Sequence, residues 1–351
     1  MHTDPAPEAV ADGPSERRPE TLLVMARDVL HVQFGEPEFA RLRTAATTAE
    51  PLATDELASP GIRARLASVE VLITSWGCPR LDDGVLRAAP RLRAVFHAAG
   101  SVRGHVDERL LDRGIVVTTA ADANAEPVAR YTLAAVLWSF KKVPFLAQDA
   151  REYREDLTYR DRRGELSGHG RTVVIVGFSR IGRRVTTLLR SLHEGPILVV
   201  DPFADPAEVH AAGAELVDLG EALPRADVLS LHAPLLPETR HMIGTAELAE
   251  LRPGTTLINT ARGALVDTTA LELACASGRL DAVLDVTDPE PLPAGSPLYD
   301  LPNVLLTPHI AGSQGTETHL MAGAALTELE RYAAGLPPLH AVTRRTLAVQ
   351  A

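Results

Sequence analysis

Cysteine is scarce in this chain of 351 residues, which contains only Cys78 and Cys275. The two cysteines lie far apart, and neither belongs to a CxxC or Cys/His pattern. A disulfide framework and a zinc site are therefore both unsupported, and we expect no metal. Few cysteines without a disulfide framework are typical of proteins from a reducing compartment, so the expected location is cytoplasmic.

Long apolar runs and clusters of basic residues are also missing. No stretch of 18 apolar residues occurs, and the first 20 residues lack the apolar segment of a signal peptide. We expect no membrane insertion, no secretion, and a disordered tail over residues 1–20. The net charge of −11, with no basic block, excludes nucleic acid and an anionic membrane surface as the main partner. A small-molecule partner remains.

What the chain does have is enough length and apolar content for two globular domains. Its 351 residues exceed the roughly 150 of one ordinary domain, and 45% of them are hydrophobic. No repeat of solenoid period is visible. Short apolar runs alternate with amphipathic stretches, which predicts parallel βα units. In the first part of the chain the predicted strands are residues 22–25, 69–73, 92–96 and 115–117, and the predicted helices are residues 36–43, 83–88 and 107–112.

A second βα series follows one long predicted helix. This helix covers residues 126–154 and is interrupted by Pro144. Six apolar runs then match a doubly wound parallel sheet: residues 173–176, 197–200, 228–231, 256–259, 282–286 and 304–307. The pattern predicts an α/β fold of two Rossmann-like or flavodoxin-like domains. The expected substrate domain comprises residues 21–125 plus 313–351, and the expected cofactor domain residues 126–312.

The segment VVIVGFSRIGRRV has the strand, turn and helix start that hold a dinucleotide pyrophosphate. It departs from G-x-G-x-x-G because Ser179 stands at the second glycine, where a side chain would crowd the phosphate. An ordinary βα turn would have the same pattern. However, Asp201 closes the next strand, where a carboxylate accepts both ribose hydroxyls, and this favours NAD. The candidate contacts are Gly177, Ser179, Arg180, Ile181, Gly182 and Asp201.

Polar residues end four of the later predicted strands. His232, Arg262, Asp285 and His309 each follow an apolar run. Any one of them is explained equally well by a structural hydrogen bond. Ligands bind at the carboxyl edge of open α/β sheets, so four such residues together with Glu290 predict one site there.

The segments LHAPLLPETRHMIG, INTARGALVD, LDVTDPEPLP and LTPHIAGS together resemble the D-isomer-specific 2-hydroxyacid dehydrogenase family, over roughly residues 70–330. The resemblance implies a catalytic set of Arg262, Glu290 and His309. The chemistry fits, because a planar guanidinium can hold a 2-oxo acid while an imidazolium beside a carboxylate delivers a proton. In the reverse direction neutral histidine is the base, so reduction should prefer lower pH and oxidation higher pH.

The resemblance also implies further cofactor contacts. Asp285 would hold the nicotinamide carboxamide, although it could instead cap a loop. Thr260 and Ala261 would touch the cofactor, and His232, Ala233 and Pro234 would line the adenosine. Thr239 would lie near the pyrophosphate, and Gly312 would close over the nicotinamide.

For the substrate carboxylate, the resemblance implies backbone amides in HAAGSVRGHVD, at Gly100, Ser101 and Val102. Arg103 in this loop adds a cation that could select a second anionic group, although a solvated surface arginine fits as well. Trp76, at the end of an earlier strand, is either part of a side-chain pocket or a packed core residue. Arg130 departs from the family, which commonly has glutamate there.

The leading functional expectation is therefore NAD-dependent interconversion of a 2-oxo acid and a D-2-hydroxy acid by a homodimer. Phosphite and formate dehydrogenases share this fold and cofactor, although formate dehydrogenases typically carry glutamine at the position of Glu290. A protein of another class, an NAD-sensing corepressor, is also built on this fold. Turnover separates the enzyme from the sensor.

Overall fold

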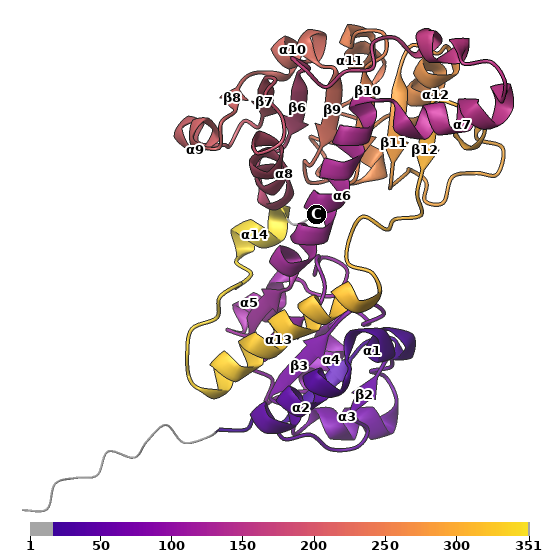
Figure 1. Cartoon of the computed structure of the whole chain (residues 1–351). Helices are drawn as coiled ribbons and strands as arrows, with labels where there is room; N and C mark the ends of the chain where they lie inside the picture. Colours follow the sequence, from indigo (N-terminus) through magenta and orange to yellow (C-terminus); the bar gives the residue numbers. More distant parts are fainter. Residues whose placement is uncertain (1–16, 350–351) are drawn as a thin grey trace, which may run out of the picture. The chain divides into compact units, whose positions relative to one another are not determined.

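The computed structural model describes residues 17–349, which divide into two compact units (Figure 1). Unit 1 comprises the chain up to Ala120 together with Thr318–Leu347, and unit 2 contains Ala121–Glu317. Most of the predicted disordered tail lies outside the described residues. For its last residues the prediction is wrong, because the Thr47 amide donates a hydrogen bond to the Pro19 carbonyl over 3.1 Å and Glu20 bridges to Thr47.

Unit 1 contains a five-stranded parallel sheet in the order β2-β1-β3-β4-β5. This is the flavodoxin-like order of a doubly wound fold. Its strands are β1 Thr21–Val24, β2 Ala53–Thr54, β3 Val71–Thr74, β4 Ala94–His97 and β5 Val116–Thr119. Its helices are α1 Arg27–Gln33, α2 Glu36–Ala45, α3 Pro60–Leu66, α4 Asp83–Ala88, α5 Glu108–Asp112, α13 Thr318–Ala333 and α14 Arg344–Val349.

The C-terminal segment completes unit 1. Helix α13 packs against α1, α2 and β4, with Ala322 and Leu326 fully buried in the core. Arg41 of α2 forms an ion pair with Glu330 of α13 at 2.8 Å. The last stretch returns to the sheet, where the Val342 amide donates to the Val117 carbonyl over 2.7 Å.

Unit 2 contains a seven-stranded parallel sheet in the order β12-β11-β10-β9-β6-β7-β8. The order reverses between β6 and β9, as in the Rossmann fold, so the predicted pair of α/β domains is confirmed. Its strands are β6 Val173–Val176, β7 Ile197–Val200, β8 Glu215–Leu216, β9 Val228–Leu231, β10 Thr256–Asn259, β11 Asp281–Leu284 and β12 Val304–Leu306. Its helices are α6 Ala121–Phe140, α7 Val143–Tyr153, α8 Arg180–Arg190, α9 Pro206–Ala211, α10 Leu219–Ala222, α11 Thr245–Glu250 and α12 Thr268–Ala276, and short 3-10 turns include Thr158–Arg163 and Gly315–Glu317.

The long predicted helix is two helices in the structure. Helix α6 already begins at Ala121 and contains Pro127 in its interior, and the chain breaks at Lys142, whose φ is 52°. Pro144 lies in the first turn of α7, where its missing N–H costs nothing. Lys142 is buried and its ammonium binds Asp281 at 2.6 Å, which anchors the break to the start of β11.

Within residues 17–349 no helix is long and apolar enough to cross a membrane. Both cysteines are free and buried, and burial raises the pKa of each thiol to about 12. In the same range, no group of three His, Cys, Asp or Glu side chains is arranged to hold a metal ion.

Candidate active site

Four neighbouring strands of unit 2 end beside the residues predicted to act. His232 follows β9, Arg262 follows β10, Asp285 follows β11 and His309 follows β12. Because all seven strands are parallel, these four ends meet at one edge of the sheet. The structure therefore brings this predicted set together.

His309 and Glu290 form a direct pair. The His309 Nδ1 lies 2.7 Å from the Glu290 Oε1, and both side chains are about half exposed, at 52% and 43%. With Nδ1 held by the carboxylate, Nε2 is the ring nitrogen left to face a reactant. His309 has a φ of 55°, a left-handed conformation that costs a non-glycine residue roughly 1–2 kcal/mol. Surrounding contacts must therefore impose it.

Asp285 supplies those contacts from the end of β11. Its buried carboxylate accepts hydrogen bonds from the Thr307 hydroxyl at 2.6 Å and from the amides of Ile310 and Ala311 at 2.8 Å. Its own carbonyl accepts the His309 amide at 2.9 Å. Of the two roles left open by the sequence, the structure displays loop capping, while contact with a nicotinamide carboxamide stays a prediction.

Arg262 stands in a loop fixed by Asn259. The Asn259 side chain donates to the Arg262 carbonyl at 2.8 Å and accepts from the Ala261 amide at 3.1 Å. Burial lowers the pKa of the Arg262 guanidinium, and the nearby Glu290 carboxylate acts against this. Arg262, Glu290 and His309 thus form one group in which the Glu290 carboxylate interacts with the guanidinium and with the imidazole.

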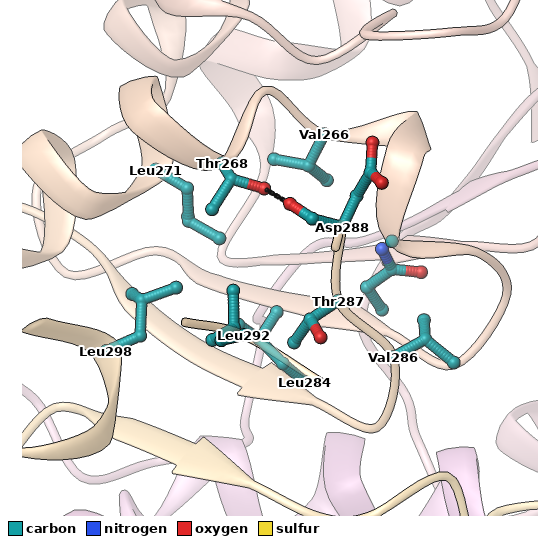
Figure 2. A pocket seen from close by; sticks show the side chains of 11 residues that line it. Val266, Thr268, Leu271, Leu284, Val286, Thr287, Asp288, Leu292 and Leu298 are labelled. Carbon is teal, nitrogen blue, oxygen red and sulfur yellow. Dashed lines mark hydrogen bonds between the residues drawn. The ribbon is translucent and has the colours of Figure 1, made fainter. Parts of the chain in front are cut away.

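The segment that leads from β11 to Glu290 is packed firmly against α12. The Thr268 hydroxyl donates to the Asp288 carbonyl at 2.6 Å, and Leu284, Leu292 and Leu298 pack beneath (Figure 2). The cavity between them holds only about 10 Å³, which is room for one water molecule. The packing around this cavity holds the segment that carries Glu290 in place, and the cavity itself is too small for a ligand.

The glycine-rich turn of unit 2 has the close backbone contacts that a pyrophosphate site needs. Gly177 has a φ of 97°, and a Cβ there would lie 2.7 Å from the Ala233 amide nitrogen. Helix α8 begins next at Arg180, so its first amides face the turn. Ser179 is exposed and is the N-cap of α8, without a side-chain cap bond. These residues fit a dinucleotide, with Ser179 in place of a second glycine.

Asp201 tightens this turn from the end of β7. Its carboxylate accepts hydrogen bonds from the Phe178 amide at 2.7 Å and the Phe203 amide at 2.9 Å. Each carboxylate oxygen has a further lone pair, so contact with ribose hydroxyls is compatible with these bonds.

Comparison with known proteins decides the family. Residues 133–311 match the model of the D-isomer specific 2-hydroxyacid dehydrogenase, NAD binding domain. The chain is 32% identical over 313 residues to glyoxylate/hydroxypyruvate reductase B of Pectobacterium carotovorum, covering 86% of this chain and 92% of that protein. The chain belongs to the D-isomer specific 2-hydroxyacid dehydrogenase family.

Other members are similar over different lengths. D-3-phosphoglycerate dehydrogenase of Mycobacterium tuberculosis is 35% identical over 257 residues, 72% of this chain and 47% of that protein. The chain thus spans about half the length of these relatives. A solved structure from Thermus thermophilus has a TM-score of 0.73 and 31% identity, covering 92% of this chain and all of that one. An NAD complex of a Lactobacillus delbrueckii member, at 21% identity and a TM-score of 0.76, shows the same fold.

Unit 2 is therefore an NAD-binding domain of this family, and its remaining predicted contacts divide into two kinds. Ala233 and Pro234 follow β9 and Ala261 follows β10, and their contacts with the cofactor stay predictions. Thr239 instead caps its own turn, donating to the Pro234 carbonyl at 2.6 Å. The Thr260 hydroxyl lies 2.9 Å from that of Thr132 on α6. Thr239 and Thr260 therefore both make hydrogen bonds within the protein, and their contacts with the cofactor stay predictions.

The sequence patterns did not single out Asn124 or Gly263, which both shape this site. Asn124 on α6 accepts the Ser313 amide at 2.8 Å, and a Cβ on Gly312 would lie 3.1 Å from the same Oδ1. A Cβ on Gly263 would lie 1.9 Å from the Thr287 carbonyl carbon, so the Arg262 and Glu290 loops meet backbone to backbone. The glycine directly after Arg262 was the available signal for the second contact; the first had none.

In unit 1 the predicted substrate loop follows β4. The Thr119 hydroxyl donates to the Gly100 carbonyl at 2.9 Å, and the Arg103 amide donates to the Ser101 hydroxyl at 3.4 Å. Val102 is fully buried, so its side chain anchors the loop in the core. Trp76 is 40% exposed and is therefore not the packed core residue that the sequence left possible. Arg130, the departure from the family, forms an ion pair with Glu126 at 3.0 Å on its own helix.

His232 makes the stability of unit 2 sensitive to acid. Its Nε2 lies 2.9 Å from the Ser230 hydroxyl, and burial lowers the pKa of the ring from 6.5 to about 3. The neutral ring stabilises the fold fully above pH 6.5, and this stabilisation is lost as the pH falls toward 3, by about 2 kcal/mol between pH 7 and pH 5. We expect His232→Asn to show a smaller loss of unfolding free energy over that interval in urea titrations. The exposed control His210→Asn should lose as much as wild type, and equal losses in all three proteins would contradict the assignment.

Proposed function

We propose that this chain is an NAD-dependent oxidoreductase that interconverts a 2-oxo acid and a D-2-hydroxy acid. One observation carries the proposal: the 2.7 Å pair of His309 Nδ1 and Glu290 Oε1 stands beside Arg262 on the carboxyl edge of the NAD-binding sheet. A histidine with one nitrogen on a carboxylate and the other outward is the arrangement of a general acid and base.

Each residue of the group has a distinct task in the proposed reaction. When bound at the turn after β6, NADH would be the source of the hydride for the carbonyl carbon of the 2-oxo acid. Arg262, partly buried and planar, holds the carboxylate and polarises the carbonyl oxygen. His309 donates the proton from Nε2 to that oxygen, and Glu290 stabilises the imidazolium before transfer. In oxidation, neutral His309 accepts the hydroxyl proton, and the Glu290 carboxylate stabilises the imidazolium that forms.

Unit 1 supplies the substrate domain in this proposal. The amides of Gly100, Ser101 and Val102 would bind the substrate carboxylate, and Arg103 would favour a second anionic group. The same proposal places the enzyme in the cytoplasm as a homodimer. Support for the dimer comes from large apolar side chains exposed on or after α6, namely Trp138, Val143 and Leu157. Light scattering on the purified protein measures this assembly.

The proposed function is tested by NADH consumption with a panel of 2-oxo acids. Glyoxylate, hydroxypyruvate and its phosphate, pyruvate, phenylpyruvate and a branched-chain acid cover small, charged, aromatic and aliphatic side chains. We expect turnover with at least one of them, at a rate typical of enzymes, about 1–1,000 per second. Arg103→Ala should lower kcat/KM for the phosphorylated acid more than for the other acids. An equal loss for all acids would show that Arg103 does not select a second anionic group.

A negative panel is informative in its own right. If the protein binds NADH and reduces none of the acids, formate and phosphite with NAD come next. Absence of turnover there too would overturn the enzymatic proposal and leave an NAD-binding sensor.

A further inference from the structure

Helix α6 contacts the loops of the candidate site through consecutive residues. The Tyr131 hydroxyl lies 2.7 Å from the Thr307 hydroxyl, in the loop of His309. The next residue, Thr132, reaches Thr260 in the loop of Arg262. The helix packs against strands β9 and β10 of unit 2 (Figure 1). Neither Tyr131 nor Thr132 was singled out by its sequence pattern.

The neighbours of the Tyr131–Thr307 contact decide which of the two hydroxyls is the donor. Thr307 has one hydroxyl proton, and it is donated to the Asp285 carboxylate at 2.6 Å. The Tyr131 hydroxyl must then be the donor to Thr307. Burial raises the pKa of Tyr131, so the phenol keeps its proton at neutral pH. The two bonds therefore point in one direction, from Tyr131 through Thr307 to Asp285.

Asp285 in turn determines the backbone around His309. It accepts the amides of Ile310 and Ala311 with its carboxylate and that of His309 with its carbonyl. These bonds hold His309 at a φ of 55°, which an isolated histidine would leave. Consecutive hydrogen bonds polarise one another, and these are partly buried, so loss of the first donor weakens the rest.

We propose that Tyr131 is a positioning residue for the acid–base step, holding His309 against Glu290 through Thr307 and Asp285. The inference rests on the proposed function for its kinetic consequence. Its structural content, the order imposed on residues 307–311, is independent of any substrate.

The kinetic test is Tyr131→Phe, which removes one oxygen and keeps the ring. We expect kcat to fall about fivefold to tenfold, the usual effect of one hydrogen bond, with little change in the KM of the 2-oxo acid. A looser His309–Glu290 pair releases the proton more readily, so the alkaline limb of the reduction profile should move to lower pH. A merely structural defect would lower activity equally at every pH.

Two further variants define the route. Thr307→Val breaks the middle of the chain, and Tyr131→Phe should add nothing to it if both act through the same bonds. Thr132→Val is the matched control on the same helix, because it removes a hydroxyl contact of 2.9 Å that leads to the other loop. Its pH profile should match that of wild type.

Hydrogen exchange provides a readout that needs no turnover. In Tyr131→Phe the amides of Ile310 and Ala311 should exchange roughly tenfold faster than in wild type, while core strands keep their protection. Unchanged exchange of these amides together with an unmoved pH profile would overturn the inference. If wild type reduces no 2-oxo acid yet the exchange effect is present, the proposed function fails and the positioning role stands.

Discussion

Replacing His309 with asparagine is expected to lower kcat by roughly 100-fold to 10,000-fold, the range that a general acid and base contributes. Asparagine is the appropriate replacement because His309 has a φ of 55°, and asparagine adopts this conformation more readily than alanine. The variant keeps the backbone bonds to Asp285 and loses only the titratable ring. NADH binding, followed by fluorescence, should be unchanged, because the cofactor turn lies at the ends of other strands.

The matched control is His210→Asn. His210 is exposed in the last turn of α9, away from the strand ends that carry the candidate site. It should retain wild-type turnover and the same preference of reduction for lower pH. If His309→Asn retained more than about a tenth of wild-type kcat, well above the loss expected for an acid–base residue, another group would have to be the proton donor.

Gly182→Ala should have the largest effect on folding. By helix propensity alone, alanine in place of a glycine within α8 would stabilise the protein by about 1 kcal/mol. Here the added Cβ would lie 1.9 Å from the Gly177 carbonyl oxygen, a backbone atom of the tight turn after β6. Because backbone cannot move aside as a flexible side chain can, we expect a destabilisation of about 3 kcal/mol and loss of NADH affinity. Urea unfolding and NADH fluorescence measure the two effects.

Gly220→Ala separates the collision from a general effect of alanine. Gly220 also lies in a helix of unit 2, α10, and nothing lies within 4 Å of a Cβ built there. This variant should be as stable as wild type or slightly more stable, with unchanged NADH affinity. Equal behaviour of the two variants would show that close packing between α8 and the turn does not govern this part of the fold.

The central strands were predictable because their signal is local. β6, β7, β9 and β10 coincide with predicted runs, since a buried parallel strand reads as continuous Val, Ile and Leu. The edge strands β2 and β8 were not predicted, because two residues of mixed exposure leave no periodicity to detect. The start of α6 was placed too late for a similar reason: Pro127 looks like a helix boundary, and only tertiary packing extends the helix back to Ala121.

The candidate site was predictable only where residue chemistry is distinctive. Arg262 and His309 follow the ends of two strands and Glu290 lies in the connection between β11 and β12, and the structure brings the three together. Tyr131, Asn124 and Thr132 carry no such signal. They lie on a helix far away in sequence, and a tyrosine or asparagine on a half-buried helix face is ordinary until its partner is known.

The division of the chain has a consequence for the order in which the protein is made. The strands of unit 2 lie in one uninterrupted stretch, Ala121–Glu317, so all of them leave the ribosome before α13 does. Unit 1 lacks α13, and with it the buried side chains of Ala322 and Leu326, until the segment that follows unit 2 is translated. Domains generally fold as units during synthesis, so the NAD-binding domain is able to form first. The unit whose strands emerge first is thus the one that waits for α13, which follows all of unit 2, to close its core.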